Sequence, residues 1–325
     1  MPSVSIVIPV YNGIRTLHRP LEALRKQSLK DIEIIIVDDC SDDGSLAWAD
    51  KFLRNGAVPY KVLSLDCHGG VSAARNLGMK EAAGDCVFFL DADDYIEKTC
   101  LEKLYSLFCD DENVDVAFCG FRRVNVLGEV LQQYFPRKKY LNHAVSGTEA
   151  LNLFWKSKID LHMTSCMVRR SFLFEKSVFF YDGCIYREDF EFFSRVLYEA
   201  RKVASFPEEL SSYVVDKSST TGKSEFMNKA AIHELSVFIR LRKMVGESGN
   251  AGELVNLIEK LTLHGYIEVL ERTLKKGKQE EFRLMMESER IRKSLAASFR
   301  RDIFLVKPEY FLKVLRLYLC FIIYR

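Results

Sequence analysis

Three carboxylates stand at the end of an apolar stretch of the chain. The segment "FFLDADDYI" (88–96) begins with large apolar side chains and continues with Asp91, Asp93 and Asp94. Acids this close repel one another unless a cation lies between them. Carboxylate oxygens suit Mg²⁺ or Mn²⁺, and the D-x-D spacing lets Asp91 and Asp93 face one metal ion. The alternative is an acidic turn that begins a helix at Tyr95.

Residues in earlier segments can bind a nucleotide. Asp39, in "IIIVDDCSDDGS" (34–45), can hold a base or a ribose, although Asp, Ser and Gly are also usual in strand-to-helix connections. Tyr11 follows an apolar run and can stack on a nucleobase, or it can be an ordinary core tyrosine. Arg75, in "HGGVSAARNLG" (68–78), can bind phosphate bidentately or lie at the surface.

A later pair of acids can act on a proton. In "REDFEFF" (187–193), either Glu188 or Asp189 can be a general base for a hydroxyl nucleophile. The alternative is that they only complement the dipole at a helix N-terminus. We expect ordinary roles for His68 and His162, because neither has a partner at a spacing typical of a metal pair.

The elements that must position these residues follow a regular order. Helical patterns separate four apolar runs that are expected to be strands: 4–10, 32–39, 60–66 and 86–94. This alternation predicts an α/β fold with a doubly wound, mostly parallel sheet. Ligands bind at the carboxyl ends of such strands, so the acids after the second and fourth strands should share one edge. Ser72 and Thr148 are the expected N-caps of two helices, and residues 118–140 should form two strands.

Composition limits the class and the location of the protein. The chain has 325 residues, 48% of them hydrophobic, which is enough for one large domain with an appendage. A net charge of +2 gives no overall sign of nucleic-acid binding. The nine scattered cysteines form no CxxC pair, so a reducing cytoplasm fits better than a disulfide framework or a zinc site. "MPSVSIVIPVYNG" lacks the pattern of a signal peptide, and no apolar run is long enough to span a bilayer.

The patterns divide the chain into two domains near Lys223. Residues 1–223 contain all the segments quoted above, and residues 224–325 are expected to be helical. The last 36 residues (290–325) contain nine basic residues, few acids and many apolar ones. Such a segment can lie on an anionic membrane surface. The alternatives are a helical cap docked on the first domain and a contact in a homo-oligomer.

Taken in order, these segments resemble the inverting glycosyltransferases of family 2, whose nucleotide-sugar-binding fold is usually called GT-A. The resemblance covers residues 3–221 and rests on six segments: "VSIVIPVYNG", "IEIIIVDDCSDDGS", "GGVSAARNLG", "FFLDADD", "YREDFEFF" and "YVVDKSSTT". It implies transfer of a sugar from a UDP-sugar donor to a hydroxyl of a glycan or lipid-linked acceptor, in surface polysaccharide synthesis. It leaves the C-terminal third uncovered.

The resemblance also implies which residues bind the donor. Pro9, Tyr11 and Asp39 would hold the uracil and the ribose. Arg75 would lie near the base or the diphosphate, and Asp91 would contact the ribose or the sugar. No G-x-G-x-x-G segment follows the first strand, which argues against an enzyme that uses a nicotinamide dinucleotide.

The resemblance assigns the chemistry to further acids. Asp93 would ligate Mn²⁺ or Mg²⁺, Asp189 would be the catalytic base, and Glu188 would touch the acceptor or the sugar. Many relatives carry a His in the last segment, at the position that Asp216 occupies in "YVVDKSS" (213–219). An ionised Asp cannot donate a hydrogen bond to phosphate, but it can bind the metal.

Two rival functions follow from the same residues. A nucleotidyltransferase also needs metal-binding carboxylates, but it usually has a segment rich in Gly and Lys after the first strand, which is absent here. An inactive scaffold that binds a nucleotide sugar would not need to keep Asp91, Asp93 and Asp189. We expect a cytoplasmic enzyme that associates peripherally with the inner face of the cell membrane.

Overall fold

The chain forms two compact units, Met1–Ser219 and Thr220–Arg325. The second of these units is called the helical unit. The computed structural model describes residues 2–216, 224–247, 252–296 and 308–323. The domain boundary predicted near Lys223 lies outside these residues.

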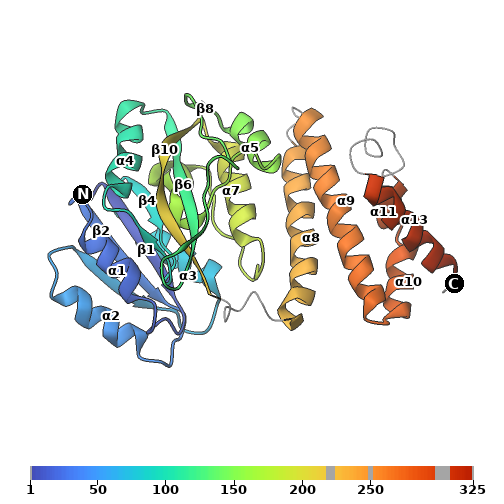
Figure 1. Cartoon of the computed structure of the whole chain (residues 1–325), viewed down its shortest axis with the longest axis horizontal. Helices are drawn as coiled ribbons and strands as arrows, with labels where there is room; N and C mark the ends of the chain where they lie inside the picture. Colours follow the sequence, from blue (N-terminus) through green and yellow to red (C-terminus); the bar gives the residue numbers. More distant parts are fainter. Residues whose placement is uncertain (1, 217–223, 248–251, 297–307, 324–325) are drawn as a thin grey trace. The chain divides into compact units, whose positions relative to one another are not determined.

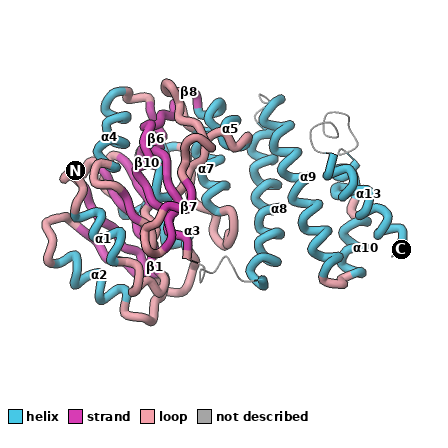
Figure 2. The backbone as a smooth tube through the Cα atoms, viewed as in Figure 1, coloured by secondary structure: helices cyan, strands magenta, loops and turns pink. Residues whose placement is uncertain are grey.

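A ten-stranded sheet forms the centre of the first unit (Figures 1 and 2). Four parallel strands, in the order β3-β2-β1-β4, form one half of it: β1 Val4–Val10, β2 Ile32–Asp38, β3 Tyr60–Ser64 and β4 Cys86–Phe89. Every residue of β1, β2 and β4 is buried. Their sequences are mostly apolar because both faces of a parallel sheet are covered.

The other half of the sheet mixes strand directions. β9 (Cys166–Arg169) runs antiparallel to both β4 and β6 (Val114–Asn125). β10 (Lys202–Val215) is parallel to β6, and β5 (Tyr95–Ile96) is antiparallel to β10. Two further short strands pair with this half: β7 (Val130–Gln132) with β6, and β8 (Val145–Ser146) with β10. The α/β class is therefore confirmed, as are the two strands predicted between residues 118 and 140.

Helices cover both faces of the parallel half: α1 His18–Arg25, α2 Ser45–Arg54, α3 Val71–Glu81 and α4 Cys100–Asp110. On one face, Ile6 and Ile8 of β1 belong to a core cluster that includes residues of α1 and α4. On the other face, α3 lies so close that a Cβ atom at Gly78 would be 2.3 Å from Cγ1 of Val7. Glycine at 78 therefore allows α3 to approach β1 and sets the position of the helix.

The remaining helical segments of the first unit are α5 Gly147–Trp155, η1 Met163–Ser165, α6 Arg170–Glu175 and α7 Glu188–Glu199. Both predicted N-caps are wrong. Ser72 is the second residue of α3, after Gly70 with φ +81°, and its buried hydroxyl has no hydrogen-bond partner. Ser146, not Thr148, caps α5, because its hydroxyl accepts a hydrogen bond from the backbone N–H of Glu149.

The helical unit consists of α8 Ser224–Glu247, α9 Gly252–Lys275, α10 Gln279–Glu287, α11 Glu289–Ala296 and α13 Pro308–Ile323. Residues from four of these helices share one apolar core, among them Leu270, Phe282, Leu295 and Leu317. Within the described ranges, none of the helices combines the length and the apolar character that crossing a bilayer requires.

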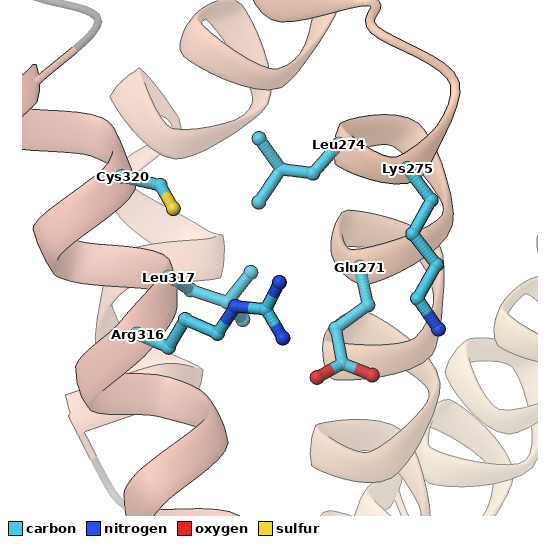
Figure 3. Close-up of a pocket in the computed structure, with 6 residues that line it drawn as sticks. All are labelled: Glu271, Leu274, Lys275, Arg316, Leu317 and Cys320. Carbon is cyan, nitrogen blue, oxygen red and sulfur yellow. The ribbon is translucent and has the colours of Figure 1, made fainter.

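A crevice of about 140 Å³ lies between α9 and α13 (Figure 3). Glu271 and Lys275 line it from α9, and Arg316 and Cys320 line it from α13. Small-molecule sites usually measure about 300–1,000 Å³, so this crevice is too small for a nucleotide sugar.

Candidate active site

The carboxyl edge of the parallel strands is built from interlocked loops. The loop after β2 holds the loop after β1, because Gly13 donates its N–H to Oγ of Ser45 (2.9 Å) and Ile14 donates to Asp43 (2.9 Å). A Cβ atom at Gly13 would lie 3.6 Å from that of Ala92, so the loop after β4 is also adjacent. The loops that follow β1, β2 and β4 thus meet at one edge, as the sequence predicts.

Asp39 fixes the turn that leads into α3. Its carboxylate accepts hydrogen bonds from the N–H groups of Gly69 (2.7 Å) and Gly70 (2.9 Å) and is buried. Nδ1 of His68 lies 3.0 Å from the same carboxylate, and the His68 ring lies 4.4 Å from that of Tyr11. Tyr11 is half exposed, so it is not a core tyrosine, and with His68 it forms an aromatic surface beside Asp39. The sequence predicts an ordinary role for His68 because it has no partner at a metal-pair spacing; its contact with Tyr11 joins residues 57 positions apart.

Two other residues of these strands are buried in the sheet. Pro9 lies within β1, opposite Val37 of β2. Asp38 ends β2, and its Oδ1 atom is buried without a hydrogen-bond partner, whereas Oδ2 accepts the N–H of Ser41 (3.0 Å). Pro9 and Asp38 are therefore buried in the sheet below the loops of the carboxyl edge, and they do not form its exposed surface.

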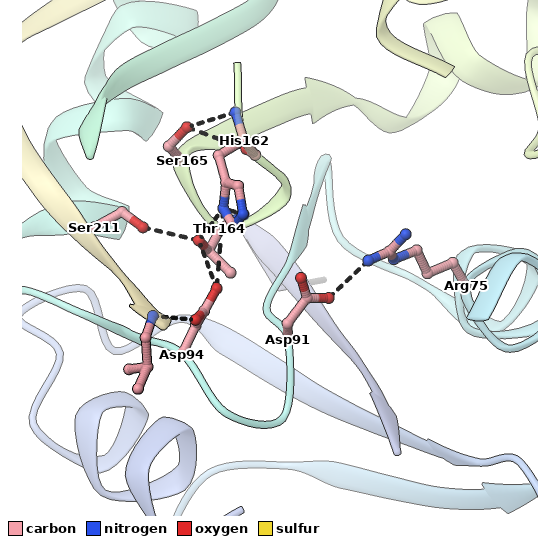
Figure 4. Close-up of polar contacts among 8 residues, drawn as sticks. Arg75, Asp91, Asp94, His162, Thr164, Ser165 and Ser211 are labelled. Atoms are coloured by element: carbon pink, nitrogen blue, oxygen red, sulfur yellow. Dashed lines mark hydrogen bonds and ion pairs between the residues drawn. The ribbon is translucent and has the colours of Figure 1, made fainter. Parts of the chain in front are cut away.

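Arg75 joins the acids of two distant segments. It donates a hydrogen bond from Nη2 to Asp91 (2.7 Å; Figure 4). Its Nη1 lies 3.6 Å from Glu188. Its guanidinium also lies over the ring of Phe180, 5.3 Å from the centroid. The side chain is only 4% exposed, so the alternative of a surface arginine is wrong. A buried arginine between two carboxylates ties the start of α7 to the end of β4.

The charge of Arg75 decides the ionisation of Asp91. Burial alone would raise the pKa of Asp91, but the charges of Arg75 and His162 and the hydrogen bond from Arg75 outweigh it and hold that pKa below its ordinary value. Burial likewise opposes the charge on Arg75, yet Asp91 and Glu188 raise the pKa of the guanidinium. Both groups are therefore charged at neutral pH.

Asp93 and Asp94 have raised pKa values, unlike Asp91, because within the described part of the chain neither carboxylate forms an ion pair with a buried arginine. Burial, followed by the charge of Asp91, raises the pKa of Asp93 to about 6. Burial also raises the pKa of Asp94 well above its ordinary value, and Asp94 is completely buried. Its two oxygens accept hydrogen bonds from the N–H of Val214 (2.9 Å) and the hydroxyl of Thr164 (3.3 Å). Asp94 thus fastens the loop after β4 to β10 and η1.

The alternative of a helix beginning at Tyr95 is wrong. Tyr95 and Ile96 form strand β5, which pairs with β10, and the next helix begins only at Cys100. The acids of "DADD" therefore do not cap a helix, and their crowding needs another explanation.

His162 lies at the centre of this group of acids (Figure 4). Its ring lies between those of Phe121 (5.1 Å) and Tyr213 (4.7 Å). One ring nitrogen and one carboxylate oxygen each from Asp91 and Asp94 lie within 4.8 Å of one another. No local pattern indicates this role, because His162 lies about seventy positions after Asp91 and Asp94.

Glu188 and Asp189 occupy the first turn of α7, as predicted. Arg187, with φ 63°, turns the chain into the helix. Burial, followed by the charge of Asp189, raises the pKa of Glu188 to about 7. The charge of Asp189 also acts on Arg75, His162 and Asp160. Asp189 therefore lies within the same electrostatic cluster as the acids after β4.

Asp216 comes directly after β10 and is exposed. Its negative charge contributes to the raised pKa of Asp93, so the two carboxylates lie near each other. Of the residues singled out in the sequence, Arg75, Asp91, Asp93, Asp189 and Asp216 are thus brought together with Glu188. Tyr11 and Asp39 lie on the same edge of the sheet, after neighbouring parallel strands.

We expect Glu188→Gln to stabilise the protein at high pH. The carboxyl group has a pKa of about 7 in the folded chain and an ordinary value of 4.5, so folding favours its protonated form between these values. The contribution of Glu188 to the stability of the wild type should therefore be lost as pH rises from about 4.5 to 7, and the glutamine variant should lack this loss. Above pH 7 the variant should have the larger free energy of unfolding, by on the order of 2–3 kcal/mol.

Urea unfolding with a metal chelator present measures this difference. Both tryptophans, Trp48 and Trp155, belong to the first unit, so their fluorescence follows that unit alone. If the difference in the free energy of unfolding between variant and wild type stayed constant from pH 4.5 to 8, Glu188 would not titrate as described.

Comparison with known proteins identifies the family. The model of the family described as "Glycosyl transferase family 2" matches residues 5–176, more than half of the chain. The chain belongs to glycosyltransferase family 2. The matched region contains the site residues from Pro9 to His162. It ends before Glu188 and Asp189 of α7.

Two curated family 2 relatives illustrate the extent of the similarity. The uncharacterized glycosyltransferase EpsJ of Bacillus subtilis is 29% identical over 225 residues, which are 68% of this chain and 63% of EpsJ. The minor teichoic acid biosynthesis protein GgaA of the same organism is 29% identical over 215 residues, 63% of this chain and 45% of GgaA. This chain thus matches less than two thirds of the length of either relative.

A solved structure of the Staphylococcus aureus protein TarS, residues 1–349 in complex with UDP, matches with a TM-score of 0.58. The match covers 91% of this chain and 78% of that one, at 23% sequence identity. At this identity the likeness establishes the fold, and it confirms the GT-A type expected from the sequence. Because the coverage exceeds the length of the first unit, the match extends into the helical unit.

Proposed function

We propose that this protein is an inverting glycosyltransferase that moves a sugar from a UDP-sugar to a hydroxyl of a glycan or lipid-linked acceptor. The observation that carries the proposal is the buried bridge of Arg75 between Asp91 and Glu188. It brings the acids at the start of α7 to the carboxyl edge of the sheet, where nucleotide ligands bind in folds of this type. In the proposed site, a metal-binding group and a general base would therefore act on the same bound donor and acceptor.

The donor side of the site is the edge formed by the loops after β1, β2 and β4. Tyr11 offers a half-exposed ring beside Asp39, which suits the stacking of a uracil and the binding of a ribose. The TarS protein has been solved in complex with UDP-GlcNAc, and its match to this chain has a TM-score of 0.59. We therefore propose a UDP-sugar donor, with a hexosyl or N-acetylhexosaminyl group as the transferred sugar.

The acids of the edge fit a divalent cation, Mn²⁺ or Mg²⁺. Asp93 and Asp216 supply hard oxygen atoms, and the raised pKa of Asp93 reflects burial and negative neighbours that a cation would offset. Asp94 fits less well, because both of its oxygens accept hydrogen bonds from the protein. Asp93 and Asp216 would therefore hold the ion. When bound, the cation would stabilise the negative charge of the departing diphosphate.

In the reaction, the acceptor oxygen attacks the anomeric carbon while the bond from that carbon to the UDP oxygen breaks. Asp189 takes the proton that the acceptor hydroxyl loses. Attack comes from the face opposite UDP, so the configuration of the carbon inverts. Glu188 touches the acceptor or the sugar, and Arg75 keeps Glu188 and Asp91 in position by its ion pairs.

The relatives suggest the biological setting. GgaA is named as a protein of teichoic acid synthesis, and TarS as a poly(ribitol-phosphate) N-acetylglucosaminyltransferase. We propose that this chain likewise acts in the synthesis of a surface polysaccharide. The free cysteines fit a reducing cytoplasm. Association of the basic C-terminal segment with a membrane, or of the chain with itself, stays a prediction, because much of that segment lies outside the described residues.

The proposal is tested by measuring UDP release from a panel of UDP-sugars with Mn²⁺, with Mg²⁺ and with a chelator. We expect release that needs a divalent cation and that favours one sugar. Release of pyrophosphate from a sugar phosphate and UTP would instead identify a nucleotidyltransferase. Binding of UDP without any turnover, with or without glycan acceptors, would favour the inactive scaffold.

A further inference from the structure

The turn between β6 and β7 presents apolar side chains to solvent. Leu127, within this turn, is 81% exposed. Three neighbouring side chains are about half exposed: Val126, Val130 and Leu131. We call these four residues the hairpin tip. Val130 and Leu131 are consecutive in β7 and point to opposite faces, and both are exposed because β7 is an edge strand paired with β6. Apolar groups gathered in this way usually mark a binding surface.

The exposure of Leu127 is imposed by the structure of the turn. The side-chain oxygen of Asn125 accepts hydrogen bonds from the N–H groups of Leu127 (3.0 Å) and Glu129 (3.0 Å). The backbone carbonyl of Asn125 accepts the N–H of Gly128 (2.9 Å), whose φ of +83° favours glycine. These bonds hold the backbone of the turn, in which Leu127 is 81% exposed.

The hairpin tip is fixed beside the proposed site. Arg19 of α1 donates a hydrogen bond to the carbonyl of Val126 (3.4 Å), and a Cβ atom at Gly128 would lie 3.9 Å from the hydroxyl of Tyr95. The charge of Arg19 also acts on Asp93. The tip is therefore held next to the acids after β4.

Two basic residues lie at the hairpin tip. Arg19 bonds to the carbonyl of Val126, and Arg123, which is exposed, pairs with Gln132 of β7. The turn itself carries one acid, Glu129, and the chain between Phe121 and Tyr140 has five basic residues. This combination of a protruding leucine with exposed basic groups is complementary to an anionic bilayer, which offers negative head groups above an apolar layer.

We propose that the hairpin tip inserts into the surface of an anionic lipid bilayer and holds the first unit there. A second copy of the chain is a poorer occupant, because four side chains on a narrow turn fall far short of the roughly 800 Å² per partner that stable complexes bury. If the proposed function holds, this docking brings the site to a lipid-linked acceptor, but the binding of lipid does not depend on that activity.

The test is co-sedimentation of the full chain with vesicles of phosphatidylcholine and phosphatidylglycerol at low salt. Replacing Leu127 and Leu131 by serine removes apolar surface without changing charge. We expect this double variant to bind anionic vesicles about tenfold or more weakly than the wild type. The matched control is Leu284→Ser, at a similarly exposed leucine (57%) of α10, and it should bind as the wild type does.

Several outcomes would overturn the proposal. Equal binding of the wild type and the double variant would place any membrane contact elsewhere, for example in the basic C-terminal segment. Failure of the wild type to bind anionic vesicles would remove the membrane as occupant. A dimer of the wild type that the double variant cannot form would identify a second copy instead. Equal thermal unfolding of the variants, followed by circular dichroism, which reports on both units, shows that each is folded. UDP release without vesicles tests the proposed function separately.

Discussion

Asp189→Asn should lower kcat by a factor on the order of 10² to 10⁴ while the affinity for UDP stays nearly unchanged. Asparagine keeps the shape of the side chain but cannot take the proton of the acceptor hydroxyl. Asp189 is not among the residues proposed to hold UDP, so the loss should fall on the chemical step. Steady-state rates of UDP release with an acceptor, together with calorimetric titration of UDP, separate the two effects.

The control for this variant is Glu199→Gln, which lies at the other end of α7 and pairs with Lys176 at the surface (3.7 Å). It should leave both kcat and the affinity for UDP close to those of the wild type. If Asp189→Asn retained full turnover, Asp189 would not be the base. Glu188 or Asp160, whose pKa values are raised and which lie in the same cluster, would then be examined.

The parallel half of the sheet could be predicted because its residues obey one simple constraint. Strands such as β1 and β2 are buried on both faces, so their sequences are mostly apolar and easily recognised. β9 could not be placed in the same way. It has only four residues, Cys166–Arg169, and its antiparallel position between β4 and β6 depends on tertiary packing that no local pattern records.

The site was predictable only where a residue type stands at a strand end or a helix start. Asp91, Asp93 and Asp189 are of this kind. His162 and Asp94 take part through contacts with residues about seventy to one hundred and twenty positions away, and no spacing rule reaches that far. The predicted caps were wrong for a related reason. α3 begins two residues earlier than expected, at Val71, because Asp39 holds Gly69 and Gly70 from another strand.

Arg75→Met should strongly destabilise the first unit. Arg75 is 4% exposed, and its loss leaves the carboxylates of Asp91 and Glu188 partly buried without their positive partner. Breaking such a buried pair usually costs about 3–5 kcal/mol, much more than an exposed ion pair contributes. The free energy of unfolding in urea, followed by the fluorescence of Trp48 and Trp155, should fall by about this amount.

Two further variants show whether unpaired charge is the cause. Arg75→Lys keeps the charge but cannot reach two carboxylates as a guanidinium does, so its loss of stability should be intermediate. Combining Arg75→Met with Glu188→Gln removes one of the stranded charges, so the double variant should recover part of the lost stability. Lys80→Met, at an exposed position of the same helix, should change the free energy by less than about 0.5 kcal/mol. If Arg75→Met were as stable as Lys80→Met, the ion pairs of Arg75 would not hold the first turn of α7 at the edge of the sheet, and the proposed geometry of the site would lose its support.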